Sequence, residues 1–228
     1  LGTVIYRPYV YAFFICYLVF AIYQMGTKRT IIYTVMAWCI AFAAEYSSTR
    51  NGFPFGPYYY IDETRTRELW ISNVPFWDSL SFVFLDYFSF LLAAALLSKK
   101  NELSKISEWS GLKKFQTPIL GGFLMMMLDV VIDPVALRGE KWFLGKMYGY
   151  PYEGFYFGIT LANFLGWWFV GIVTQTISQR FIFKSVNRTN SLYVWGVFGV
   201  YSGVFAFNLF MTFWIQEYKL AMASTVIM

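Results

Sequence analysis

Long apolar segments alternate with polar loops along the chain and predict membrane-spanning helices. A helix needs about 20 apolar residues to cross the hydrocarbon core of a bilayer, and six segments approach that length. They cover residues 4–23, 31–48, 76–97, 117–137, 155–177 and 192–215. A spanning segment must satisfy its backbone polar groups internally, so runs of this length favour helices over barrel strands. We therefore expect one all-α domain over residues 1–228, a polytopic integral membrane bundle of about six transmembrane helices.

The composition agrees with this class and narrows the chemistry. Hydrophobic residues make up 58% of the chain and charged residues 14%, whereas soluble domains are about 45–50% apolar and about 25% charged. The chain has no histidine. That absence excludes nucleophile systems that rely on an imidazole base and the commonest zinc and haem ligands. Proton chemistry must therefore run on Asp, Glu, Tyr, Lys or water.

The basic residues lie mainly in the loops between the apolar segments. The net charge of +5 is therefore better explained by anionic lipid than by nucleic acid, which we do not expect as a partner. The loops after the first, third and fifth spans carry only two acids, Glu102 and Glu108. They hold ten bases, namely Lys28, Arg29, Lys99, Lys100, Lys105, Lys113, Lys114, Arg180, Lys184 and Arg188. The positive-inside rule then places these loops in the cytoplasm and the protein in the cell membrane.

Polar residues inside the predicted spans gather at one depth. Because successive helices alternate in direction, Glu45, Asp78, Asp129, Asp133 and Asn163 all fall in the same half of the bilayer. Two tyrosine-rich loops, residues 50–74 and 138–154, bound that half, and a further acid at position 86 lies deeper. Ionisable groups in a spanning helix are costly and usually face an interior site. This layer is therefore the candidate site.

Asp129 and Asp133 are the most informative pair in this layer. Their i, i+4 spacing puts both carboxylates on one face of a helix. Two carboxylates in a low-dielectric site cannot both ionise cheaply, so one should retain a proton and be able to donate it. A purely structural alternative is that they pair with Arg50 or Arg138, or bond to Asn163 and nearby aromatic residues.

Several motifs in this region resemble a known family. After Glu45 come GFPFGPYYY at 52–60 and NVPF at 73–76. LDVVIDPVA follows at 128–136, then Trp142 and YFGITLANFLGW at 156–167. Their order and spacing, over about half of the chain, are similar to those of the carotenoid biosynthesis hydratase family, which includes the bisanhydrobacterioruberin hydratases. Thr160 stands where that family pattern has a proline.

The resemblance implies a membrane enzyme of carotenoid biosynthesis, a hydro-lyase acting on a carotenoid or other long isoprenoid within the membrane lipids. It implies hydration of a terminal C=C bond of an acyclic end group to a tertiary alcohol, without a cofactor or metal. The implied catalytic residues are Glu45, Asp129, Asp133 and Asn163. The implied substrate-binding residues are Tyr58, Tyr60, Trp142 and Trp167. The assignment of proton donor and base among the carboxylates stays open.

Other functions fit the same residues. An intramembrane prenyltransferase would use Asp-rich segments to hold Mg²⁺ and diphosphate, but it needs two such segments and the chain has one. A transporter or a non-enzymatic pigment- or lipid-binding subunit would use the buried acids to carry protons or a cation. Gly196, Gly199 and Gly203 favour close packing of the last span, either within the chain or in an oligomer or larger complex.

Overall fold

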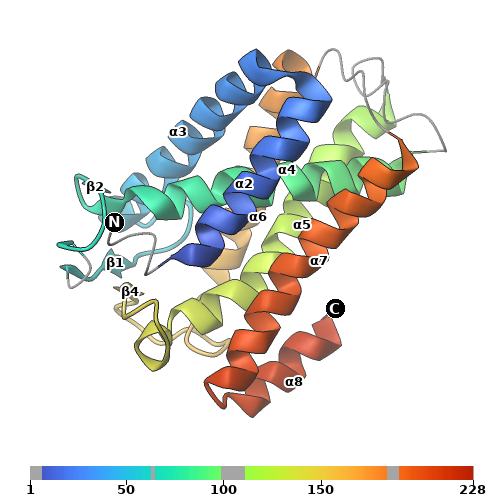
Figure 1. Cartoon of the computed structure of the whole chain (residues 1–228). Helices are drawn as coiled ribbons and strands as arrows, with labels where there is room; N and C mark the ends of the chain where they lie inside the picture. Colours follow the sequence, from blue (N-terminus) through green and yellow to red (C-terminus); the bar gives the residue numbers. More distant parts are fainter. Residues whose placement is uncertain (1–6, 63–64, 99–110, 184–189, 228) are drawn as a thin grey trace.

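Seven α-helices make up most of the described chain and confirm an all-α membrane-helical bundle (Figure 1). The computed structural model describes residues 7–62, 65–98, 111–183 and 190–227. The helices are α2 (Pro8–Met25), α3 (Thr27–Asn51), α4 (Phe76–Leu97), α5 (Leu112–Ala136), α6 (Leu161–Phe181), α7 (Ser191–Trp214) and α8 (Tyr218–Ile227). Half of the bases used to predict the orientation lie outside the described residues, namely Lys99, Lys100, Lys105, Lys184 and Arg188.

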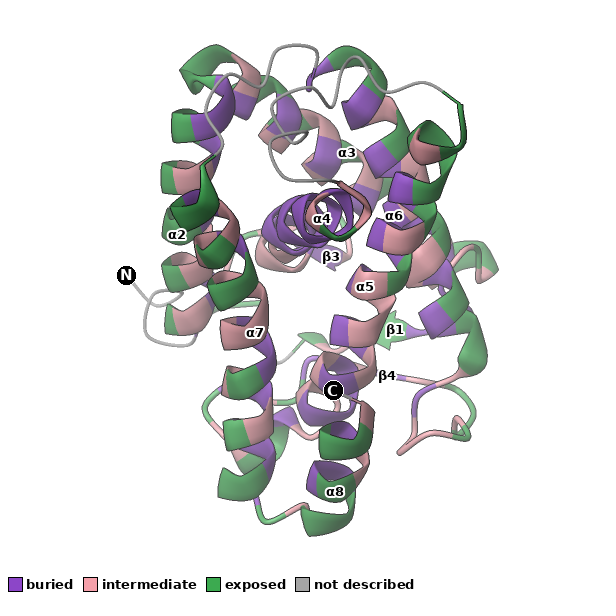
Figure 2. Cartoon of the chain, turned by 90° about the vertical axis from the view of Figure 1, so that its right-hand side faces the viewer, coloured by how far each residue is buried: buried purple, intermediate pink, exposed green. Residues whose placement is uncertain are grey.

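Helix α4 forms the centre of the bundle. Its side chains are buried almost without interruption from Ser79 to Ala94, and Figure 2 shows it nearly end-on with the other helices around it. It packs against α2, α3, α5, α6 and α7. A helix that is apolar on all sides belongs in such a position, because every face contacts protein.

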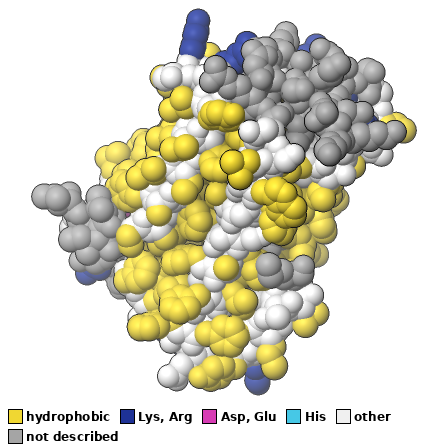
Figure 3. Space-filling model, turned by 45° about the vertical axis from the view of Figure 1, so that its right-hand side comes forward, with side chains coloured by type: hydrophobic (Ala, Val, Ile, Leu, Met, Phe, Trp, Pro, Cys, Tyr) yellow, Lys and Arg dark blue, Asp and Glu magenta, His cyan; other side chains and the backbone are white. Residues whose placement is uncertain are grey.

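Five helices are long and apolar enough to cross a membrane, namely α2, α3, α4, α5 and α7. Their outer surface is largely hydrophobic, and on the face drawn in Figure 3 the basic side chains lie at the two ends of the molecule. The predicted span over 155–177 falls on α6, the one helix of 18 or more residues among the described residues that is outside this set. Helix α6 has 21 residues but buries polar side chains, among them Asn163, Gln175 and Gln179, which lower its apolar character.

Several helices have bounds that differ from those of the predicted spans. The span predicted over 155–177 begins six residues later, because residues 154–159 form a tight turn with bridges Gly154 to Gly158 and Tyr156 to Ile159. Its aromatic residues look apolar in sequence, yet the turn ends at Thr160, whose side chain caps α6. The predicted spans 31–48 and 117–137 both begin earlier than expected, at Thr27 and Leu112. Residues 218–227, after the last predicted span, form α8.

The two tyrosine-rich loops are joined by a short antiparallel pair of strands. Strand β1 (Tyr59–Tyr60) pairs with β4 (Tyr148–Gly149), with Tyr59 opposite Gly149. Within the first loop, β2 (Trp70–Ile71) pairs with β3 (Val74–Pro75). The single-turn helix η3 (Gly139–Lys141) follows α5. These pairings hold both loops over the same end of the bundle.

A charge cluster ties α8 to the rest of the protein. Glu217, in the turn before α8, accepts a hydrogen bond from Lys141 and lies 3.2 Å from Nε of Arg138. Leu220 of α8 packs beside Met211 and Val135. The hydrogen bond from Lys141 and the nearby positive charges lower the pKa of Glu217 below its usual value of 4.5.

A carboxylate with a lowered pKa stabilises the fold above its ordinary pKa, and that contribution is lost as the pH falls through the folded-state value. We therefore expect thermal unfolding in detergent to show weaker packing of α8 below about pH 4.5. Glu217→Gln should remove this pH dependence and cost at most about 1 kcal/mol at neutral pH, since the pair is partly exposed. The exposed Glu140→Gln serves as the control. An unchanged pH profile in Glu217→Gln would contradict the assignment.

Candidate functional site

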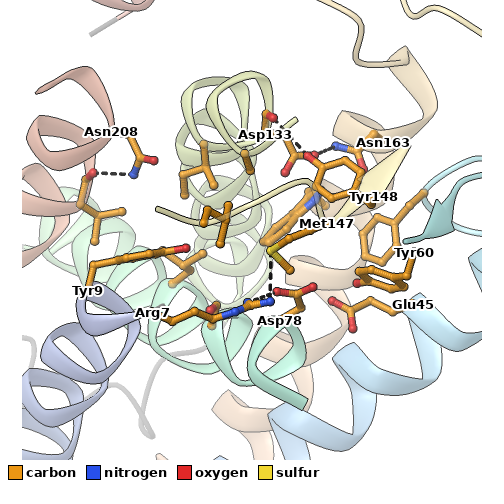
Figure 4. Close-up of a pocket in the computed structure, with 18 of the residues that line it drawn as sticks. Arg7, Tyr9, Glu45, Tyr60, Asp78, Asp133, Met147, Tyr148, Asn163 and Asn208 are labelled. Atoms are coloured by element: carbon orange, nitrogen blue, oxygen red, sulfur yellow. Dashed lines mark hydrogen bonds and ion pairs between the residues drawn. The ribbon is translucent and has the colours of Figure 1, made fainter. Parts of the chain in front are cut away.

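A single cavity brings together most of the residues that the sequence singled out (Figure 4). The cavity has a volume of about 130 Å³. It lies between α2, α3, α4, α5, α6 and α7, under the paired tyrosine loops. Seven of the eight predicted site residues line it, namely Glu45, Tyr58, Tyr60, Asp133, Trp142, Asn163 and Trp167. The eighth, Asp129, bonds to Asn163.

One wall of the cavity is an acid pair bridged by an amide. Asn163 Nδ2 donates to Asp129 Oδ2 at 2.8 Å and to Asp133 Oδ2 at 2.6 Å. Asp129 is fully buried and Asp133 is 9% exposed. With both carboxylates sharing one amide in a dry interior, a single proton held between them avoids two adjacent negative charges.

The start of α6 positions this amide. Thr160 Oγ1 accepts a hydrogen bond from the backbone N–H of Asn163, which places Asn163 in the first helical turn. The positive end of the helix dipole therefore points toward the acid pair. Gly166, one turn later, allows the loop 53–55 to approach, because a Cβ there would lie 2.7 Å from the carbonyl oxygen of Pro54.

The arginines proposed as partners of the acid pair bind elsewhere. Arg50 donates to the carbonyl oxygen of Tyr46 and to Asn73. Arg138 pairs with Glu217 and donates to the carbonyl oxygens of Pro134 and Phe157. Neither arginine pairs with the acids; Asn163 bonds both carboxylates, which is the other form of the structural alternative, and Asp129 Oδ1 is buried without a hydrogen-bond partner.

The opposite wall carries two further carboxylates. Glu45 of α3 accepts a hydrogen bond of 2.5 Å from Ser79 Oγ. Asp78, the residue before Ser79, pairs with the guanidinium of Arg7. Arg7 also contacts Glu68 at 2.9 Å, and its side chain is 4% exposed. Figure 4 shows Glu45, Asp78 and Arg7 together on the side of the cavity away from Asp133 and Asn163.

Four tyrosines from the two paired loops roof the cavity. Tyr58 and Tyr60 come from the first loop and Tyr148 and Tyr150 from the second. Their rings lie 5.3–6.3 Å apart in edge-on or tilted contacts. Burial raises the pKa of each of these phenols above its ordinary value. They are therefore neutral at physiological pH and act as hydrogen-bonding aromatic walls, as in the bond of 3.1 Å from Tyr148 Oη to the carbonyl oxygen of Asp133.

The predicted tryptophans complete the aromatic lining. Trp167 stacks on Phe82 of the central helix, with ring centroids 5.5 Å apart. Trp142 donates from Nε1 to the carbonyl oxygen of Val135 at 3.2 Å and lies 5.8 Å from the ring of Tyr9. An apolar cavity with aromatic walls and a few convergent polar groups is the usual form of a small-molecule site.

Sequence reasoning missed several cavity residues. Arg7 and Asn208 of α7 were not among the predicted site residues, although an Asn inside a spanning helix is itself a signal for an interior site. Asp86, the deeper acid, belongs to a separate buried cluster. It accepts hydrogen bonds from Tyr33 at 2.6 Å and from Gln175 at 3.0 Å.

The arrangement is suited to proton transfer. Two carboxyl groups bridged by one amide face Glu45 across an aromatic cavity, so one wall could donate a proton while the other accepts one. Among the residues that the structure describes, no three acids or cysteines are grouped so that they could hold a metal ion.

Comparison with known proteins places the chain in a family. The family model described as "carotenoid biosynthesis protein" matches residues 6–228. No curated protein and no solved structure matches the chain. Because the match covers almost the entire chain, the cavity, both carboxylate walls and the tyrosine roof all fall within it. The chain therefore belongs to the carotenoid biosynthesis protein family.

Proposed function

We propose that this protein hydrates a terminal C=C bond of an acyclic carotenoid end group to a tertiary alcohol, in the cell membrane and without a cofactor. The observation that carries the proposal is the amide of Asn163 between Asp129 and Asp133, at the edge of an aromatic cavity that Glu45 faces from the other side. An isoprenoid substrate suits this apolar interior and the role of the family.

Asp133 is the proton donor in this mechanism. It borders the cavity, whereas Asp129 contacts Asn163 from α5 without being among the lining residues. The Asp133 carboxyl gives its proton to the less substituted alkene carbon. The π bond breaks, a C–H bond forms and the more substituted carbon becomes a tertiary cation. The negative charge left on the acid pair is stabilised by Asn163, which donates hydrogen bonds to both Asp129 and Asp133.

Water completes the reaction on the cation. Aromatic faces attract a cation by about 0.5–2 kcal/mol each, and Tyr58, Tyr60 and Trp167 supply such faces in the cavity. A water oxygen forms the C–O bond, and Glu45 takes the proton that the resulting oxonium loses. That proton then returns to the Asp129–Asp133 pair through solvent, so the net change is the addition of one water.

Expression in bacteria that make an acyclic carotenoid tests the proposal. We expect a more polar product whose mass exceeds that of the substrate by one water. In medium made with heavy-oxygen water, the product should carry one heavy oxygen, which distinguishes hydration from oxygenation by O₂. Absence of a water adduct from several acyclic carotenoids, with the protein present in the membrane, would overturn the proposed function.

A further inference from the structure

The two walls of the cavity differ in charge. The wall from α5 and α6 holds Asp129 and Asp133 with a neutral amide between them. The other wall holds Arg7, which is the only basic side chain among the described residues that line the cavity. A buried cation beside a carboxylate favours the ionised form of that carboxylate. The two walls therefore differ in the group that faces their carboxylates, which is a neutral amide on one wall and a cation on the other.

Arg7 is held in place from several directions. Its guanidinium pairs with Asp78 at the start of α4 and with Glu68 in the first tyrosine-rich loop. It also contacts the sulfur of Met147, in the second such loop, at 3.1 Å. The side chains of Arg7 and Glu68 are each 4% exposed, whereas that of Asp78 is 20% exposed. Arg7 and Asp78 both line the cavity, and Asp78 is the more exposed of the two and the carboxylate of this triad that a ligand can contact.

The triad holds more acids than bases. One guanidinium faces two carboxyl groups, so a single positive charge is shared between Asp78 and Glu68. Burial opposes the charge on Arg7, but the two carboxylates outweigh it, and the pKa of Arg7 is raised above its ordinary value. Fixed charges aimed at the position where a charge develops are the strongest catalytic device available in a dry site.

We propose that Asp78 is a further functional carboxylate of this site and that Arg7 is its positioning residue. The ion pair with Arg7 holds the Asp78 side chain beside the cavity. Asp78 then supplies the negative charge that stabilises the substrate cation formed when the opposite wall donates its proton. The inference rests on the proposed function and makes it more specific, because it assigns the donor to the Asp129–Asp133 wall and the cation-stabilising charge to the Arg7–Asp78 wall.

A combined substitution separates this role from a structural one. Arg7→Gln with Asp78→Asn removes this ion pair as a neutral unit, and adding Glu68→Gln keeps the buried Glu68 from losing its cation. The matched control is Arg65→Gln with Asp62→Asn. It also removes an Arg–Asp ion pair, of 3.3 Å, but both of its side chains are exposed. We expect the triple variant to fold and to hydrate at least about a hundredfold more slowly, and the control to match the wild type.

Single variants keep the inference testable if that triple variant does not fold. Asp78→Asn leaves Arg7 paired with Glu68, and it should lower kcat with little change in KM, the pattern of an interaction made only in the transition state. Arg7→Lys keeps the positive charge and should retain much of the activity. Wild-type rates in folded Asp78→Asn, or in the folded triple variant, would overturn this inference and leave the hydratase function standing. A wild-type protein that forms no water adduct would overturn both.

Discussion

Asp133→Asn is expected to abolish most of the hydration activity while leaving the fold intact. An amide is nearly the same size as the carboxyl and can still bond to Asn163, but it has no proton to give to an alkene. Loss of a general acid typically costs about a hundredfold to ten-thousandfold in rate. The rate of water-adduct formation in membranes with matched protein levels measures this effect.

Two further variants make the result specific to Asp133. Asp129→Asn should slow the reaction less, because that residue acts through its neighbour rather than on the substrate. Asp62→Asn, an exposed aspartate in the first tyrosine-rich loop, should behave like the wild type. If Asp133→Asn hydrates at the wild-type rate, Asp133 is not the donor, and the assignment passes to Glu45, the carboxylate across the cavity.

Asn163→Leu is expected to reduce both stability and activity. Leucine is similar in size but removes the two hydrogen bonds of 2.6 and 2.8 Å to the acid pair. A buried polar group left without its partner costs about 1–3 kcal/mol. Thermal unfolding in detergent should therefore show a lower melting temperature, and the hydration rate should fall because the proton is no longer held between the two carboxylates.

The pH dependence of Asn163→Leu gives a sharper test. Protonating the remaining carboxylate removes the negative charge that the amide normally stabilises by its two donated bonds, so the stability lost at neutral pH should be partly recovered in mild acid. Asn51→Leu, at the exposed end of α3, is the control and should show no such recovery. An equal loss of stability at both pH values would show that Asn163 acts by packing alone.

The helices themselves were largely predictable from local pattern. Uninterrupted apolar runs such as the one that became α4 have no alternative in lipid, because a helix satisfies every backbone group within the segment. The helix bounds differ from the predicted spans where a loop is itself rich in apolar residues. Residues 154–159 are aromatic enough to pass for a span, yet glycines and the cap at Thr160 turn them into a loop. Helix α6 is too polar to be counted with the other five apolar helices.

The sequence predicted most of the residues that meet at the cavity but not the contacts among them. Helix direction and spacing placed Glu45, Asp129, Asp133 and Asn163 at one depth, since the rise per residue of a helix is fixed. Depth alone says nothing about rotation around each helix axis. The sequence therefore left open whether the acids meet each other, an arginine or lipid.

By itself, the sequence determined that this is a helical membrane protein, because the length and order of apolar segments are properties of the sequence; it also predicted that the carboxylates lie at one depth. Only the tertiary structure decided that Asn163 bridges the acid pair, that Arg7 pairs with Asp78, and that two distant tyrosine loops close over one cavity. These contacts join residues 30 or more positions apart. Their partners are selected by how the helices pack around α4, and no local pattern records that packing.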